Sequence, residues 1–550
     1  MSHAIQSLRP LGTILVPAVA VIAIVLSRHR PDIREGWTLL AATIQTLLVA
    51  TLIPGVLDGH VYTTDLGSLV AGVRFSLQAD ALGVLFALVA SSLWLCASIY
   101  NVGYVRLKAE HNQTRYFASF AATLAAVGGV AFAANLLTLF IFYELLTVAT
   151  YPLVTHKETD AARSAGRTYL TYAFGGGVLV FIGILLVYWL VGSLAFTPGG
   201  IAALGNADPV FARVAFALLA TGFGVKAALM PLHSWLPGAM VAPTPVSGLL
   251  HAVAVVKSGV FALTRVALDM YGPETMELLG LAFPLAVVAA TTTLLASLLA
   301  LRQENLKRLL AYSTVSQLSY IVLGIAVFSP TAMTGGLFHI PAHAVMKLGL
   351  FLCVGIIYVE THVEHIDGLA GIARRLPVTM TAFAVCAAGM IGIPFTAGFV
   401  SKWYLVLGSL DAGVALFAGV LVVNGILKVV YFWPVIYQAF FETRGDHDPK
   451  PVLGSPLGGR SEQGNSGTPD TIHVSDGGHS SQAVSHVGDH YESQFDENGE
   501  WIPRAIGSES SWLLVGPVVL LAVGTVALGI APDSMIAFDL VRVAVNGVVA

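Results

Sequence analysis

The chain has 550 residues, of which 56% are hydrophobic and 11% are charged, and its mean hydropathy is +0.78. Soluble globular domains carry about 25% charged residues, so this composition excludes a soluble protein. The formal net charge of −4 comes from few charges and provides no basic face for a nucleic acid partner.

Fourteen apolar segments follow one another along the chain, and a helix of about 20 such residues crosses a bilayer. The first segment has no small-residue cleavage signature, so we expect it to remain as a helix rather than to act as a signal peptide. We therefore predict an all-α membrane protein with about 14 transmembrane helices. The predicted spans, numbered in chain order, cover residues 10–27, 37–57, 80–101, 115–134, 135–155, 168–194, 211–240, 245–270, 276–300, 309–328, 331–358, 376–408, 412–441 and 511–531.

Lysine and arginine residues in the predicted loops indicate the orientation of the chain. The first loop carries Arg28, Arg30 and Arg34, and the third, fifth, ninth and eleventh loops are also basic. The even-numbered loops hold little beyond Arg74 and Arg213. Because cytoplasmic loops are enriched in such residues, we expect a multi-pass protein of the plasma or inner membrane with both termini outside.

Residues 442–510 differ from the rest of the chain, because they are rich in Gly, Ser, Asp and His. Such a segment cannot bury a core, and we predict a disordered cytoplasmic linker. Its histidines offer metal ligands, but their irregular spacing favours a solvated linker, so no metal site is expected there. These histidines are His447, His473, His479, His486 and His490.

Cys96, Cys353 and Cys386 lie inside apolar runs and do not have the spacing of metal ligands. We expect them to pack in the core as small apolar side chains rather than to act as disulfide partners or cluster ligands. No nucleotide, haem or flavin motif is visible in the sequence. We therefore expect no cofactor and no redox chemistry in this chain.

Ionisable side chains occur near the centres of several predicted spans. A charge at the bilayer centre costs about 2.5–3.5 kcal/mol on insertion scales. His339, His343 and Lys347 recur every four residues, which places them on one helical face. The central groups in chain order are Glu144, Lys226, His251, Lys257, His339, His343, Lys347, Lys402 and Lys428.

Two interpretations account for these groups. They either form buried pairs that hold helices together, or they line a path for protons across the bundle. The five lysines and one glutamate among these groups lie at similar depth in different helices, which favours the second interpretation. A row of titratable side chains bridged by water is what proton conduction requires, and we expect Glu144 and Lys226 to influence each other's charge.

Pro231 and Pro394 fall inside predicted spans seven and twelve, each within eight residues of a central lysine. Proline removes a backbone hydrogen bond, and broken membrane helices are tolerated where they line a cavity. Spans four to eight and nine to thirteen are therefore predicted to be two five-helix repeats, inverted because five is odd. The expected domains are 1–114 (spans one to three), 115–270 and 271–441 (the repeats), 442–510 (the linker) and 511–550 (span fourteen).

Five stretches carry a resemblance to a known family. They are "LLTLFIFYELLTVATYPLV", "VKAALMPLHSWLPGAMVAPTPVSGLLHAVAVVKSGVF", "NLKRLLAYSTVSQLSYIVLG", "LFHIPAHAVMKLGLFL" and "GIPFTAGFVSKWYL". They resemble the proton-translocating antiporter-like family of Mrp-type Na⁺/H⁺ antiporter subunits and membrane-arm subunits of complex I and membrane-bound hydrogenases. Because the chain ends soon after span fourteen, the resemblance is to the D-type Mrp subunits.

The resemblance implies roles for individual residues. Glu144 and Lys226 match the pair that drives proton uptake, and His251 matches a histidine that links the half-channels. Trp403 stands where related subunits often have an acid, and Asn305 replaces an acid next to Lys307. The remaining implied roles are a central relay of His339, His343 and Lys347, a terminal acid/base residue Lys402, and a cytoplasmic mouth near Lys307.

The function implied is that of a proton-translocating subunit of a multisubunit Na⁺(K⁺)/H⁺ antiporter, a transporter subunit rather than an enzyme. The expected partners are other hydrophobic subunits, protons, monovalent cations and the lipid bilayer, with no nucleic acid. The alternative is a proton-pumping membrane-arm subunit of a complex I-like NADH:quinone oxidoreductase or membrane-bound hydrogenase. A membrane scaffold without transport and a subunit of a dissolved-inorganic-carbon pump are further alternatives.

Overall fold

The computed structural model describes residues 3–70, 72–443, 494–495 and 500–549. Thirteen segments of this described part are helical, long and apolar enough to cross a membrane, and each matches one predicted span. They are α1 (Arg9–Leu26), α2 with α3 (Pro31–Ala50 and Ile53–Leu57), α4 (Ala81–Leu107), α5 (Gln113–Phe132), α6 (Leu136–Val154), α7 (Asp160–Val191), α9 (Pro209–Lys226), α11 to α13 (Thr244–Ala252, Val255–Arg265 and Gly272–Leu278), α14 (Ala282–Ala300), α15 (Leu306–Ala326), α16 (Pro330–Thr361), α19 (Ala415–Phe441) and α21 (Trp512–Ile530). The remaining predicted span, 376–408, is divided between α17 (Pro377–Ile391) and α18 (Ala397–Asp411).

Polar residues immediately before several of these helices define where they begin. The Asn135 side chain accepts a hydrogen bond from the Thr138 amide, 2.8 Å away, at the start of α6. Asn305 accepts hydrogen bonds from the amides of Lys307 and Arg308 at the start of α15. A side-chain acceptor satisfies amide groups that the first helical turn leaves unpaired. Asn305 therefore serves as a helix cap, a role that does not require the acid expected at this position.

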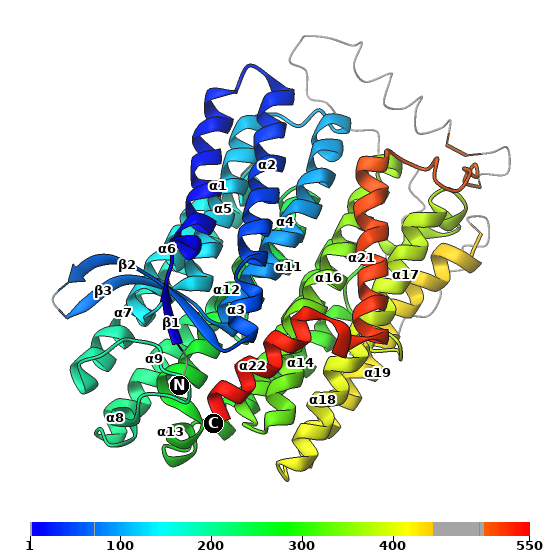
Figure 1. The fold of residues 1–550 in the computed structure, drawn as a ribbon. Coiled ribbons are helices and arrows are strands. Elements are labelled where there is room, and N and C mark those ends of the chain that lie inside the picture. Colours follow the sequence, from blue (N-terminus) through cyan, green and yellow to red (C-terminus); the bar gives the residue numbers. More distant parts are fainter. Residues whose placement is uncertain (1–2, 71, 444–493, 496–499, 550) are drawn as a thin grey trace.

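The most buried helices are α15, α16 and the segment α11–α12, and the other long helices surround them (Figure 1). α14 packs on α15, α7 packs on α9, and α16 packs on α18. Outer helices keep large apolar side chains exposed, including Trp189 on α7 and Trp433 on α19. Apolar residues on the outside of a bundle, rather than only in its centre, are what a lipid environment requires.

A small β-sheet lies at one edge of the helical bundle and was not anticipated from the sequence (Figure 1). Strand β1 (His3–Gln6) pairs in parallel with β2 (His60–Val70), which pairs antiparallel with β3 (Val73–Ala79). The hairpin connects predicted spans two and three, outside the apolar runs. A further amphipathic helix, α22 (Ile536–Val549), follows α21 and packs on α16 and α4. The protein is thus mostly helical, as expected, with this sheet added.

Both predicted helix breaks are present. α9 ends at Lys226, and turns containing Pro231 lead to the short helix α10 (Trp235–Gly238). α17 ends at Ile391, and Pro394 lies in the gap before α18. These two interruptions confirm the prediction that spans seven and twelve are broken.

A third interruption falls inside predicted span eight and was not predicted. Val253 and Ala254 leave helical geometry, with φ/ψ values of −122°/−54° and −97°/−85°, and separate α11 from α12. The interruption contains no proline, so no residue type marks it in the sequence. It lies between His251 and Lys257, two of the candidate site residues.

The predicted linker is shorter than expected at its C-terminal end. Its central residues 444–493, with the five histidines named above, and 496–499 lie outside the described residues. Trp501 is buried and its Nε1 donates a hydrogen bond to the Ala370 carbonyl, 3.0 Å away. Glu509 is buried too, and its carboxylate accepts hydrogen bonds from the amides of Val378 and Thr379. Composition cannot reveal this docking, because it depends on unpaired amides at the start of α17.

Candidate functional site

At the first break, Lys226 forms the C-terminal end of α9 and is 1% exposed. Its ammonium group donates a hydrogen bond to the Tyr143 carbonyl on α6 and lies 3.4 Å from the centre of the Tyr143 ring. Trp235 Nε1 donates a hydrogen bond to the Val225 carbonyl, 2.8 Å away. Trp235 thus ties the turns after the break to the last turn of α9, and a helix C-terminus is a favourable position for a cation.

Glu144 follows Tyr143 in the chain and points toward α7. Neither of its carboxylate oxygens has a hydrogen-bond partner among the described residues. A Cβ atom added at Gly177 would lie 2.6 Å from Glu144 Oε1, so only glycine leaves room for the carboxylate there. Glu144 and Lys226 lie within electrostatic range of each other. No ion pair within 4.0 Å joins them in the described structure.

The middle of the bundle contains three buried titratable groups without local partners. His251 on α11, Lys257 on α12 and His343 on α16 are each at most 1% exposed. The two imidazole rings and the ammonium group have no hydrogen-bond partner in the part of the chain that the structure describes. Buried polar groups are normally hydrogen-bonded to protein or to ordered water. These groups thus mark places where water or a transferred proton would satisfy them.

The second break carries a continuous set of hydrogen bonds. Lys402 Nζ donates to the Met390 carbonyl at the end of α17, 2.6 Å away, and Gln317 Nε2 donates to the same oxygen at 3.1 Å. Gln317 Oε1 lies 2.7 Å from His339 Nε2, and His339 Nδ1 lies 2.8 Å from the Ser401 hydroxyl. Lys402 and His339 are therefore connected through one carbonyl and one amide side chain.

The three residues predicted on one face of span eleven are all buried along α16. The rings of His339 and His343 have centroids 5.8 Å apart. Lys347 Nζ donates hydrogen bonds to the Ser313 hydroxyl at 2.8 Å and to the Leu310 carbonyl at 3.1 Å, both on α15. His339 also contacts α15, through Gln317. The shared face of α16 is thus turned toward α15.

Lys428 belongs to the same cluster, although sequence reasoning assigned it no role. Its ammonium group is fully buried and donates to the Tyr320 hydroxyl at 2.7 Å. Asn424, one turn earlier on α19, donates to the same hydroxyl at 2.8 Å. The Tyr320 ring lies 5.4 Å from the His339 ring, between centroids. The i, i+4 spacing of Asn424 and Lys428 in an apolar span was the available signal.

Lys307 lies apart from this row, in the first turn of α15. It is 8% exposed, and its Nζ lies 3.4 Å from the Ala242 carbonyl, which is its hydrogen-bond acceptor. Lys307 thus lies at the start of a spanning helix, and its place at the mouth of a pathway stays a prediction. Glu110, His111 and His156 form a separate group of possible metal ligands, outside the row.

Comparison with protein families identifies the part of the chain that holds these groups. Residues 133–428 match the model of the family described as "NADH:quinone oxidoreductase/Mrp antiporter, TM". This region contains every candidate residue from Glu144 to Lys402, and Lys428 is its last residue.

Two relatives illustrate the range of the family. The chain is 36% identical over 354 residues to NADH-quinone oxidoreductase subunit N of Desulforudis audaxviator, covering 63% of this chain and 69% of that protein. It is 32% identical over 463 residues to a probable K⁺/H⁺ antiporter protein of Rhizobium meliloti, covering 81% of this chain. The chain spans only 45% of that longer relative.

A solved structure agrees with these sequence matches. A chain of the Mrp complex from Dietzia sp. superimposes with a TM-score of 0.76 at 24% identity, covering 99% of this chain and 100% of that chain. At this identity the similarity demonstrates the fold. With 296 residues matched by the family model (133 to 428 inclusive), the chain belongs to the NADH:quinone oxidoreductase/Mrp antiporter transmembrane family, as its motifs indicated.

Proposed function

We propose that this chain is the proton-translocating subunit of a multisubunit Na⁺(K⁺)/H⁺ antiporter. The observation that carries the proposal is the row of titratable groups from Glu144 to Lys402, half-buried at these two ends and buried between them, which runs through three interrupted helices. Ionisable groups inside a membrane bundle typically serve ion or proton transfer, because their burial is otherwise costly. The Rhizobium meliloti antiporter protein, which aligns with 81% of this chain, supports a cation-coupled process.

In the first half of the row, Glu144 is the proton acceptor and Lys226 responds to its charge. A carboxylate near an ammonium group favours the charged lysine, and a proton arriving on Glu144 removes that support. Lys226 then passes its proton toward Lys257 and His251. Because Gly259 on α12 packs directly against the Lys226 backbone, the two broken helices meet at this step.

In the second half, His343, His339 and Lys402 carry the proton toward the other side. The Gln317 amide and the Met390 carbonyl hold His339 and Lys402 at fixed positions. The Gln317 amide and the Met390 carbonyl do not need to titrate, because their function is to orient His339 and Lys402. Lys347 is held by Ser313 and connects the two halves.

The predicted domain boundaries and orientation complete the proposal. Residues 115–270 and 271–441 contain the same order of elements: three continuous spans follow one another, then come a broken span and a further span. This order supports two repeats in inverted orientation. With odd-numbered loops in the cytoplasm, both termini lie outside, in a plasma or inner membrane, and the partners are other membrane subunits.

Glu144→Gln and Lys226→Met test the proposal, because each keeps the shape of the side chain and removes its charge. We expect each variant to reduce cation-dependent proton movement in everted vesicles by at least about ten-fold, which corresponds to about 1.4 kcal/mol. Glu277→Gln, an exposed carboxylate after the first repeat, is the matched control and should transport normally. Normal exchange in a well-expressed Glu144 or Lys226 variant would remove that residue from the mechanism.

A second candidate function is that of a proton-pumping subunit in a redox complex. The 36% identity to subunit N of an NADH-quinone oxidoreductase favours it. Both functions use the same row of residues, so the partners distinguish them. Purification of the intact complex should yield only hydrophobic antiporter subunits if the first proposal holds, and subunits with iron–sulfur clusters if the second does.

A further inference from the structure

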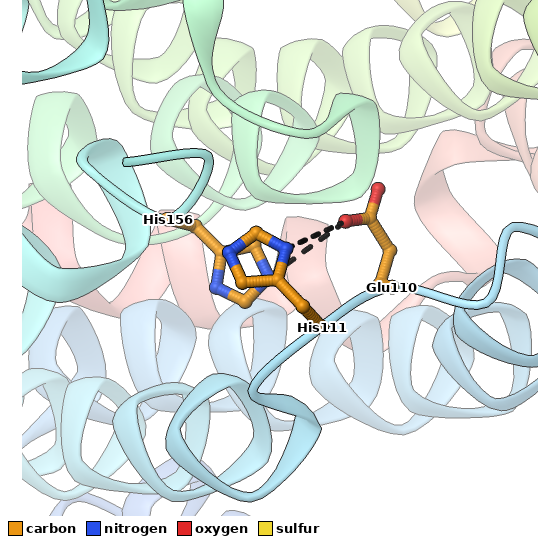
Figure 2. Close-up of side chains that lie close together, drawn as sticks. All are labelled: Glu110, His111 and His156. Carbon is orange, nitrogen blue, oxygen red and sulfur yellow. Dashed lines mark ion pairs between the residues drawn. The ribbon is translucent and has the colours of Figure 1, made fainter. Parts of the chain in front are cut away.

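Two loops at one end of the bundle bring three possible metal ligands together. Glu110 and His111 lie between α4 and α5, and His156 lies directly after α6. Their ligand atoms all lie within 4.8 Å of one another. Figure 2 shows one carboxylate oxygen of Glu110 facing both rings, which stack with centroids 4.9 Å apart. Glu110 Oε2 lies 3.8 Å from His156 Nε2 and 4.0 Å from His111 Nδ1.

His156 is the member of this group that most needs a partner. Its side chain is fully buried, and neither ring nitrogen has a hydrogen-bond partner among the described residues. The ring is held in place by the edge of Tyr116, with centroids 5.2 Å apart, and by Arg115, which donates a hydrogen bond to the His156 carbonyl. His156 Nε2 faces the Glu110 carboxylate but is too far from it for a hydrogen bond. Buried polar atoms are normally hydrogen-bonded, so the unsatisfied ring nitrogens of His156 call for a partner.

The surroundings of His156 also favour its neutral form. Burial lowers the pKa of His156 to about 4, and the nearby His111 and Arg115 act in the same direction. Arg115 is itself paired with Glu158, which offsets its positive charge near the group.

We propose that Glu110, His111 and His156 bind a divalent transition metal ion of the Zn²⁺ class. Two imidazoles and one carboxylate form a known three-ligand set for zinc, which leaves a fourth position for water. Mg²⁺ and Ca²⁺ are disfavoured, because both prefer oxygen ligands. Occupancy would connect the α4–α5 loop to the end of α6, the helix that carries Glu144.

The geometry requires only a small adjustment to accept the ion. Ligand atoms in a tetrahedral zinc site are about 3.3 Å apart, given metal–ligand distances of about 2.0–2.1 Å. Movement of His111, whose side chain is 46% exposed on a surface loop, can shorten its 4.0 Å distance to Glu110. The 3.8 Å between Glu110 and His156 must shorten by about 0.5 Å, through a shift of the Glu110 side chain. His156, whose side chain is fully buried, provides the fixed part of the site. The proposal is independent of which ions the chain transports.

Zinc binding by the purified full-length chain tests the proposal, with a purification tag that contains no histidine. After chelator treatment and addition of ZnCl₂, bound zinc per chain is measured by elemental analysis and its affinity by calorimetry. We expect the parent to bind about one more zinc ion than His111→Ala, since removing one of three ligands abolishes a site of this kind. The comparison between variants cancels any zinc bound by histidines elsewhere in the chain.

The choice of His111 keeps the test informative, because its side chain is exposed and its loss should leave the fold intact. His29→Ala, an exposed histidine on another loop, is the matched control and should bind as much zinc as the parent. The proposal is overturned if His111→Ala binds the same amount of zinc as the parent with the same affinity. It is also overturned if His29→Ala shows the larger loss.

Discussion

At the scale of single residues, Gln317 occupies a position that no charge marks. Its amide donates to the carbonyl that also accepts from Lys402, and its oxygen lies next to His339. Gln317→Met keeps the size of the side chain and removes both hydrogen bonds. We expect proton translocation to fall by about ten-fold, which corresponds to about 1.4 kcal/mol in the transfer step, with assembly unchanged.

Initial rates of proton movement in vesicles measure this effect. Gln303→Met is the matched control, because Gln303 lies in the loop after α14 and its side chain donates to the Leu299 carbonyl at the end of that helix. A Gln317→Met variant that transports at the rate of the parent would show that protons pass from His339 to Lys402 without this link.

Gln317 also shows which residues of a membrane site can be recognised from the sequence. Lysine, glutamate and histidine inside apolar spans are conspicuous, because their burial is costly. Neutral partners such as Gln317 and Tyr320 cost less and resemble ordinary polar residues. The row of charged groups was thus predictable, whereas the groups that connect them were not. His111 and His156, 45 positions apart in the chain, are brought together only by the fold.

At the scale of elements, the breaks depend on close backbone contacts as well as on proline. Proline predicted two interruptions, at Pro231 and Pro394, and both are present. The third, at Val253 and Ala254, has no such signal. The helix that follows it, α12, packs against the α9 break at Gly259, where a Cβ atom would lie 2.4 Å from the Ala227 amide nitrogen.

Gly398 serves the second break in the same way, and its substitution provides a test. A Cβ atom at Gly398 would lie 1.9 Å from the Gly389 carbonyl oxygen, so α17 and α18 must separate in Gly398→Ala. Overpacking of this kind typically costs about 1–3 kcal/mol. We expect a loss of stability at the upper end of that range, together with reduced transport, because Met390 next to Gly389 holds Lys402.

Thermal unfolding in detergent, compared with transport, checks this expectation. Gly419→Ala on α19 is the matched control, since a Cβ atom there meets nothing within 4 Å. It should behave as the parent in both measurements. Equal stability of Gly398→Ala and Gly419→Ala would mean that the contact between α17 and α18 does not define the break.

At the scale of the whole molecule, hydrophobic length determines most of the fold. Every predicted span has a helical counterpart, because a bilayer requires long apolar helices whose backbone groups are all paired. Features outside the bilayer follow no such requirement. The hairpin at His60–Ala79 and the docking of residues 500–510 depend on local pairing of backbone groups, which hydropathy does not report.

The two ends of the predicted linker, residues 442–510, meet at one place on the bundle. The Glu442 carbonyl and the Trp501 ring lie 3.2 and 3.8 Å from the position of a Cβ atom at Gly371. A short connection can therefore join them. Deleting residues 455–490 should leave the thermal transition and proton transport close to those of the parent, because closing a shorter loop costs less entropy.

The docked end of the segment should respond in the opposite way. Glu509 accepts hydrogen bonds from two amides in the first turn of α17, and Glu509→Ala leaves both unpaired in a buried position. An unsatisfied buried amide costs about 1–3 kcal/mol, so we expect this variant to unfold at a lower temperature than the deletion. A deletion that destroys transport in an assembled complex would show that residues 455–490 are required. A Glu509→Ala variant as stable as the parent would show that the docking of residues 500–510 does not stabilise the fold.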